Sequence, residues 1–137
     1  MADSPSLAIR QAIRERANFR CEYCLRPESR SWFPFEPDHV IALKHGGPTE
    51  LENLAFACMD CNRHKGTDLA SIDVETGRVV RLFHPRRDRW AKHFEMRKGV
   101  IVPRTSIGRV TEHVLQLNRP EVVEIRRWLI SKGLLKL

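Results

Sequence analysis

No stretch of this sequence stays apolar over the roughly 20 consecutive residues that a membrane-spanning helix needs. The sequence also lacks internal repeats, low-complexity tracts and recognisable linkers, so it shows neither a repeat architecture nor a domain boundary. With 137 residues and 42% hydrophobic content, the composition is typical of a globular fold rather than a disordered chain. We therefore expect one domain over residues 1–137, located in the cytoplasm and not bound to a membrane.

Cysteine is also scarce, but the four cysteines form two pairs with the same two-residue gap. Such a gap lets both thiolates of one turn reach the same ion, and Zn²⁺ favours four tetrahedral ligands in structural sites. Disulfide bonds are the competing use of four cysteines. Nothing marks the chain as secreted, however, and paired spacing of this kind in a cytosolic protein favours metal. We predict a structural Zn²⁺ ion held by Cys21, Cys24, Cys58 and Cys61.

Basic residues outnumber acidic ones in this chain. Lys and Arg total 24 against 17 Asp and Glu, which gives a formal net charge of +7 at pH 7. A charge of this sign points to a polyanionic partner, with nucleic acid as the leading candidate. The alternative, that a basic surface only aids solubility, stays open on charge alone because net charge identifies no specific site.

The middle of the chain predicts a strand, a loop, a second strand and a short helix. The first strand should begin after Pro37, with the prolines near its start excluding a central position in a sheet. Glycines and a proline then predict a loop, and the apolar residues 54–57 predict the returning strand of a hairpin. A helix should follow from near Asp60 to about Gly66.

Helical spacing of apolar residues predicts further elements on both sides of this segment. Near the N-terminus, Ser4 should cap a helix that has Pro5 at its first position. Trp90 and Phe94 are four residues apart and would share one helix face, and Asn118 could cap the last helix. The predicted elements after the middle segment are a strand at 79–83 and helices at 85–94, 105–117 and 120–132.

Polar motifs accompany the cysteine pairs in a fixed order. Asp38-His39 and Asn53 lie between the pairs, while Asn62 and Lys65-Gly66 follow the second pair. Over about residues 17–66, this order resembles HNH endonucleases of the ββα-metal type with an added four-cysteine zinc site. The resemblance implies an α+β fold with helices at both ends. The implied parts are an N-terminal helix within 1–20, a zinc-stapled ββα-metal core at 21–66 and a strand and helical extension at 67–137 packed on the core.

The same resemblance implies a phosphodiester hydrolase and gives roles to the polar residues. His39 would be the general base, Asn53 would fix the loop and help to orient His39, and Asp38 and Asn62 would bind a divalent cation. These residue types suit the chemistry, because imidazole titrates near pH ~6.5 and Mg²⁺ or Mn²⁺ prefers oxygen ligands. Asn62 stands where the family's third histidine is expected, which favours Mg²⁺ or Mn²⁺ over softer metals. DNA is the expected substrate, cut to a 5′-phosphate and a 3′-hydroxyl.

Basic side chains near the motifs are candidates for contacts with the nucleic-acid backbone. They are Lys65, Arg63, Arg86 and Arg87. Each also has an ordinary explanation: Lys65 could only complement the helix dipole, and an arginine could only be solvated. The stretch 82–94 also resembles bacterial HNH proteins, but the sequence assigns it no chemistry.

A second class of function fits the cysteines and the charge equally well, namely a zinc-binding module that holds nucleic acid without cutting it. Such a binder would not need Asp38, His39, Asn53 and Asn62 in this arrangement, so the nuclease is the leading hypothesis. The oligomeric state, monomer or homodimer, and the choice between DNA and RNA stay open.

Overall fold

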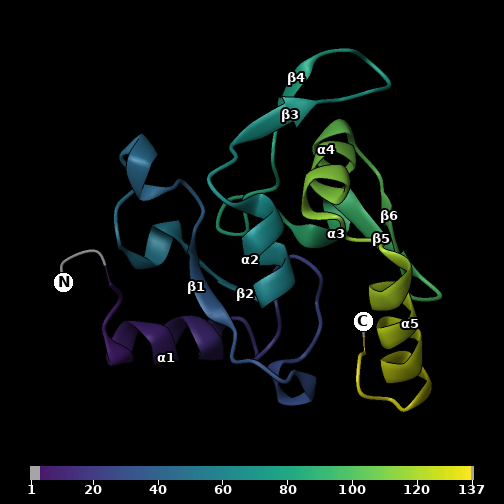
Figure 1. The fold of residues 1–137 in the computed structure, drawn as a ribbon, viewed down its shortest axis with the longest axis horizontal. Coiled ribbons are helices and arrows are strands. Elements are labelled where there is room, and N and C mark those ends of the chain that lie inside the picture. The colour runs from purple at the N-terminus through teal and green to yellow at the C-terminus, as the bar shows by residue number, and fades with distance from the viewer. Residues whose placement is uncertain (1–3, 137) are drawn as a thin grey trace.

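The computed structural model describes residues 4–136. It combines helices with two-stranded antiparallel sheets, so the predicted α+β class with helices at both ends is confirmed (Figure 1). In chain order the helices and strands are α1 (Leu7–Arg16), β1 (Glu36–His39), β2 (Leu54–Ala57), α2 (Met59–Lys65), β3 (Ala70–Ile72), β4 (Val79–Arg81), α3 (Trp90–His93), β5 (Phe94–Arg97), β6 (Val100–Pro103), α4 (Ser106–Leu115) and α5 (Pro120–Ser131). No helix among these described residues is long and apolar enough to cross a membrane.

Helix α1 begins two residues later than predicted from Ser4. Ser6 is its N-cap, because the Ser6 hydroxyl accepts a hydrogen bond from the backbone N–H of Ile9 at 3.2 Å. Ile13 on the inner face is fully buried, and the helix contacts strand β2. The apolar stripe predicted for this segment therefore covers the central hairpin.

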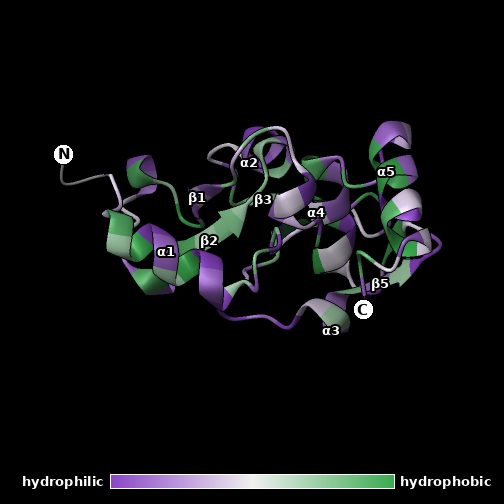
Figure 2. Ribbon diagram, turned by 90° about the horizontal axis from the view of Figure 1, so that it is seen from below, coloured by the Kyte–Doolittle hydropathy of each residue, from purple (hydrophilic) through white to green (hydrophobic). Residues whose placement is uncertain are grey.

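Strands β1 and β2 form that hairpin, with Asp38 opposite Ala55 and His39 opposite Leu54. Strand β1 starts at Glu36 and ends at His39, so Asp38 and His39 lie at its end and not at its start as predicted. A two-stranded sheet leaves β1 with an open edge, which is the position that accommodates the proline within it. Strand β2 is buried along its whole length and is coloured green in the hydropathy view (Figure 2).

Helix α2 follows the hairpin and matches the prediction closely. Cys58 is its N-cap, with Sγ accepting from the N–H of Cys61 at 3.4 Å. Gly66 ends it with a φ of +52°, a conformation that favours glycine. The hairpin and α2 together make the ββα unit, and α2 also contacts α4 at the centre of the molecule (Figure 1).

The predicted helix over residues 85–94 is largely wrong. Only Trp90–His93 is helical, and Phe94 already begins strand β5. The Asp88 carboxylate accepts from the backbone N–H of His84 at 2.8 Å, which holds the preceding residues in turns. The rings of Trp90 and Phe94 still pack together, with centroids 5.2 Å apart. Their four-residue spacing in the sequence therefore corresponds to a real contact, although the two residues do not share one helix.

The C-terminal helices α4 and α5 lie close to their predicted bounds, but the predicted cap of α5 is wrong. Asn118 does not cap it: the Asn118 amide exchanges hydrogen bonds with the backbone of Ile101 at 2.9 and 2.8 Å. The residue at the N-cap is Arg119, which makes no capping bond with its side chain. Strands β3, β5 and β6 were not predicted, because each is only three or four residues long.

One cluster of buried side chains connects these elements. It extends from Ile13 in α1 through the four cysteines and strand β2 to Phe83, Phe94 and Leu117. Helix α4 contacts β3, β4 and β6 as well as α2. The segment after residue 66 thus shares its apolar core with the ββα unit.

Candidate metal and catalytic centre

The four cysteines gather in one buried cluster. Their Sγ atoms all lie within 4.8 Å of one another, and the Sγ atoms of Cys24 and Cys58 are 3.7 Å apart. None of the four forms a disulfide. Four thiolates around one Zn²⁺ at about 2.3 Å would be about 3.8 Å apart in a tetrahedron, so this set fits such an ion. The four predicted ligands are therefore placed so that they could hold a metal ion such as Zn²⁺.

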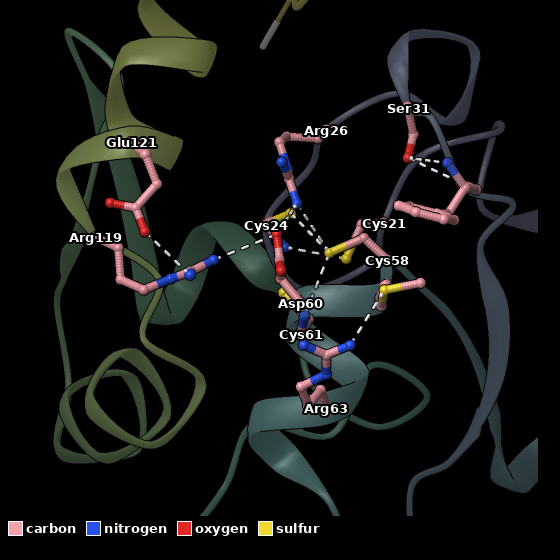
Figure 3. Close-up of polar contacts among 12 residues, drawn as sticks. Cys21, Cys24, Arg26, Ser31, Cys58, Asp60, Cys61, Arg63, Arg119 and Glu121 are labelled. Atoms are coloured by element: carbon pink, nitrogen blue, oxygen red, sulfur yellow. Dashed lines mark hydrogen bonds and ion pairs between the residues drawn. The ribbon is translucent and has the colours of Figure 1, made fainter.

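Basic side chains surround the cluster (Figure 3). Arg26 Nη2 donates to Cys58 Sγ at 3.3 Å and to Asp60 Oδ2 at 3.0 Å, and Arg119 pairs with the same carboxylate at 3.3 Å. Burial raises the pKa of the Cys21 thiol, whereas hydrogen bonds with neighbouring thiols lower the pKa of Cys24. The guanidinium of Arg26 would offset part of the negative charge of a four-thiolate site.

The two residues inside the first cysteine turn connect this cluster to the rest of the unit. Glu22 Oε2 accepts from the backbone N–H of Phe56 at 2.8 Å, and the Glu22 N–H donates to the Phe56 carbonyl at 2.9 Å. Tyr23 is 0% exposed, and its hydroxyl donates to Asp38 Oδ2 at 2.7 Å. The cysteine turn thus fixes both strand β2 and the carboxylate at the end of β1.

Asp38 is buried between two donors, with only 3% of its surface exposed. Lys65 Nζ lies 3.3 Å from each Asp38 oxygen and donates to the His39 carbonyl at 3.2 Å. Burial raises the pKa of the Asp38 carboxyl, while the charge of Lys65 and the hydrogen bond from Tyr23 oppose that rise. Oδ2 meets both Tyr23 and Lys65, whereas Oδ1 meets Lys65 alone and keeps a second lone pair, so this arrangement orients Asp38 and leaves Oδ1 able to bind a cation.

Asp38, His39 and Asn62 line one open depression of about 280 Å³, beside the end of β1 and the end of α2. His39 Nε2 lies 2.9 Å from Thr49 Oγ1. The side-chain amide of Asn62 forms no hydrogen bond with any residue within 4–136, so its Oδ1 is available to a ligand. The hairpin places the end of β1 beside the later part of α2, so His39 and Asn62, which are 23 positions apart, meet in one hollow.

Asn53 fixes the loop that carries Thr49. Its Nδ2 donates to the carbonyls of Ile41 and Pro48, and its Oδ1 accepts from the Ile41 N–H, each at 2.9 Å. A Cβ at Gly47 would lie 1.7 Å from the Ile41 oxygen, so this loop closes tightly enough to need glycine there. Among the described residues, the Asn53 side chain forms hydrogen bonds with Ile41 and Pro48 and none with His39, so its support of the histidine passes through the loop.

The predicted nucleic-acid contacts divide into two groups. Lys65 is 1% exposed and held by Asp38, so its predicted phosphate contact is not supported. Arg86 is half-buried and pairs with Glu22, so it too is engaged inside the protein. Arg63 and Arg87 are exposed, and neither forms an ion pair with a described residue. Lysine and arginine side chains are usually at the surface, so the burial of Lys65 beside a carboxylate could not be predicted from the sequence.

Residues 21–68 match the family described as HNH endonuclease. The chain contains an HNH domain. A curated relative, the Septu protein PtuA of Bacillus mycoides (strain KBAB4), is 34% identical over 109 residues, covering 72% of this chain but only 15% of that protein. No solved structure matches significantly.

Sequence reasoning missed two residues that support the HNH centre. The sequence assigned no role to Tyr23, which lies between two cysteines, or to Thr49, which follows Pro48. The motif around residues 82–94 has a structural role that the sequence did not reveal, because Trp90 Nε1 donates to the Tyr23 carbonyl at 2.9 Å and Phe83 meets the Tyr23 ring edge-on at 6.3 Å. An isolated tyrosine or threonine gives no sequence signal of such partners.

Proposed function

We propose that this chain is a metal-dependent endonuclease that hydrolyses phosphodiester bonds in nucleic acid, with DNA as the first substrate to test. The observation that carries the proposal is that Asp38, His39 and Asn62 line a single open depression within the HNH domain. The net charge of +7 supports a polyanionic substrate. We also propose Zn²⁺ as the ion of the cysteine cluster, in a structural role.

His39 would act as the general base. A neutral ring with its proton on Nε2 donates to Thr49 Oγ1, and this leaves the Nδ1 lone pair free to accept a proton from the attacking water. In this tautomer Thr49 would hold the direction of the ring. Asn53 keeps Thr49 in place by closing the loop.

Asp38 and Asn62 would hold Mg²⁺ or Mn²⁺, because a carboxylate and an amide carbonyl are the oxygen ligands that such ions prefer. When bound, the ion offsets charge that develops on the scissile phosphate and on the departing 3′ oxygen. Tyr23 and Lys65 keep the Asp38 carboxylate in one orientation. Arg63 and Arg87 are the exposed cations of the predicted set and would contact the phosphate backbone.

A plasmid assay tests this proposal. Supercoiled plasmid with Mg²⁺ or Mn²⁺ should become nicked or linear, and His39→Ala should reduce the rate by about 100-fold or more, the usual contribution of a general base. His113→Ala is the matched control, because His113 is an exposed histidine on α4 and outside the depression. Equal cleavage by His39→Ala and wild type would refute the assignment.

The same experiment separates the alternative function. A protein that binds nucleic acid tightly but shows no turnover with any divalent metal would be a non-catalytic zinc-binding module. Binding and turnover should be measured on the same preparation, after its zinc content is determined by elemental analysis.

A further inference from the structure

A second cavity lies next to the proposed catalytic depression, and the function proposed above assigns it no ligand. It has a volume of about 360 Å³, which is within the about 300–1,000 Å³ of typical small-molecule sites. Val40 and Ile41, which directly follow His39, form one wall, and Leu69 and Phe83 contribute to others. The two hollows therefore share the chain segments that leave β1 and α2.

His84 lines this cavity and presents an unused donor. Its side chain is 9% exposed, and its Nδ1 accepts a hydrogen bond from the backbone N–H of Arg86 at 3.2 Å. Nδ1 is therefore unprotonated, and in the neutral ring the proton is on Nε2. No residue in the described part of the chain accepts a hydrogen bond from Nε2. Burial and the nearby charge of Arg87 lower the pKa of His84, which favours the neutral ring.

The rim of the cavity adds charges of both signs. Arg87 is exposed and forms no ion pair within residues 4–136, whereas Arg81 is held by two bonds to Asp88 at 2.7 and 2.9 Å. Asp68 is exposed on the rim, and its carboxylate has no hydrogen-bond donor among the described residues. A ligand would thus meet one N–H donor, one carboxylate acceptor, apolar walls and a free guanidinium.

We propose that this cavity binds one unpaired nucleobase of the strand that the HNH centre cuts, with Arg87 contacting a neighbouring phosphate. The inference rests on the proposed nuclease function and adds a substrate subsite to it. Sites for single bases combine apolar or aromatic walls with a few hydrogen bonds to the base edge, which is the combination present here.

The polar groups also predict which bases fit. Adenine and cytosine each present an amino group beside a ring nitrogen acceptor. The Asp68 carboxylate would accept from the amino group, and His84 Nε2–H would donate to the ring nitrogen. In the same pose thymine would place its O4 against the Asp68 carboxylate and its N3–H against His84 Nε2–H, so neither hydrogen bond would form. A base can enter only when it is outside a stacked duplex, so single-stranded or locally unpaired substrates should bind best.

Binding measured in a His39→Ala background tests the subsite independently of cleavage. The probes are short fluorescent single-stranded oligonucleotides of dA, dC or dT, and a dA oligonucleotide with abasic positions, followed by anisotropy. His84→Asn keeps an acceptor near Nδ1 and removes Nε2. We expect it to weaken binding of the dA and dC probes by about 10-fold, within the range for one bound base, and to leave the abasic probe unchanged.

Asp68→Asn should reduce the preference for dA and dC over dT, and His113→Asn is the matched control on the exposed face of α4. All variants should melt at the wild-type temperature, which shows that the fold is intact. Equal affinities of wild type and His84→Asn for every probe would overturn the subsite. If the wild type shows no cleavage, but His84→Asn still loses base-dependent binding, the nuclease function would be rejected and the base subsite would stand.

Discussion

Replacing Tyr23 with phenylalanine removes a single oxygen atom at the junction of the cysteine cluster and the proposed catalytic centre. The ring can keep its edge-on contact with Phe83, so the change acts mainly on the hydrogen bond to Asp38 at 2.7 Å. Tyr23 is fully buried, and solvent water cannot easily take the place of the lost hydroxyl. Asp38 would be left with Lys65 as its remaining side-chain partner.

A hydrogen bond to a charged acceptor contributes about 1.5–3 kcal/mol, which corresponds to roughly 10–150-fold in an equilibrium constant. Part of this free energy should be lost as stability of the fold, and only the remainder should weaken metal binding. We therefore expect the lower end of the range, a fall of about 10-fold in the affinity of the proposed Asp38–Asn62 site for Mg²⁺ or Mn²⁺. The hydrogen bond from Tyr23 also lowers the pKa of Asp38. Its loss should raise that pKa further, and the defect in metal binding should therefore grow as the pH is lowered.

Mn²⁺ binding followed by electron paramagnetic resonance gives the affinity directly, and the metal dependence of plasmid nicking gives an independent value. Zinc content should stay unchanged. The matched control is Thr111→Val, which removes another buried hydroxyl that bonds to Phe83 N–H and to the Ile107 carbonyl, away from Asp38. If Tyr23→Phe and Thr111→Val lose stability equally, and neither changes Mn²⁺ affinity, the positioning role of Tyr23 is wrong.

Two further predictions concern stability. A strong chelator should remove the ion of the cysteine cluster and lower the melting temperature, because the four buried thiols join segments that are far apart in sequence. The near-ultraviolet circular dichroism signal should be lost as well, and adding Zn²⁺ should restore it. An unchanged melting curve after verified zinc loss would contradict this. A hydrogen bond from Arg109 lowers the pKa of Asp73 from 3.8 to about 2. The stabilisation is therefore present above about pH 4 and lost as the pH falls towards 2. Urea unfolding from pH 2 to 6 should show a steep acid limb in wild type and a flatter one in Asp73→Asn; parallel curves would argue against this contribution.

The parts of the fold that were predictable depend on local spacing. Two-residue gaps between cysteines, and an Asp-His dipeptide followed by a helix, give the cluster and the ββα order without knowledge of distant contacts. The other features of the fold and of the site depend on contacts between residues that are far apart in the sequence. Lys65 could have pointed outward from α2, but a buried carboxylate draws its ammonium group inside. Trp90 and Phe94 have helical spacing, yet the carboxylate of Asp88 folds the chain before them into turns.

The cysteine turn at residues 21–24 has requirements beyond its metal-binding sulfurs. Of its two inner residues, Glu22 forms a hydrogen bond with strand β2 and Tyr23 forms one with Asp38. A zinc knuckle transplanted from an unrelated protein would restore coordination but not these two attachments. A chimera with a transplanted knuckle should therefore carry the inner dipeptide together with the cysteines, because otherwise the cysteine cluster would bind its ion while the Asp38 carboxylate loses its alignment.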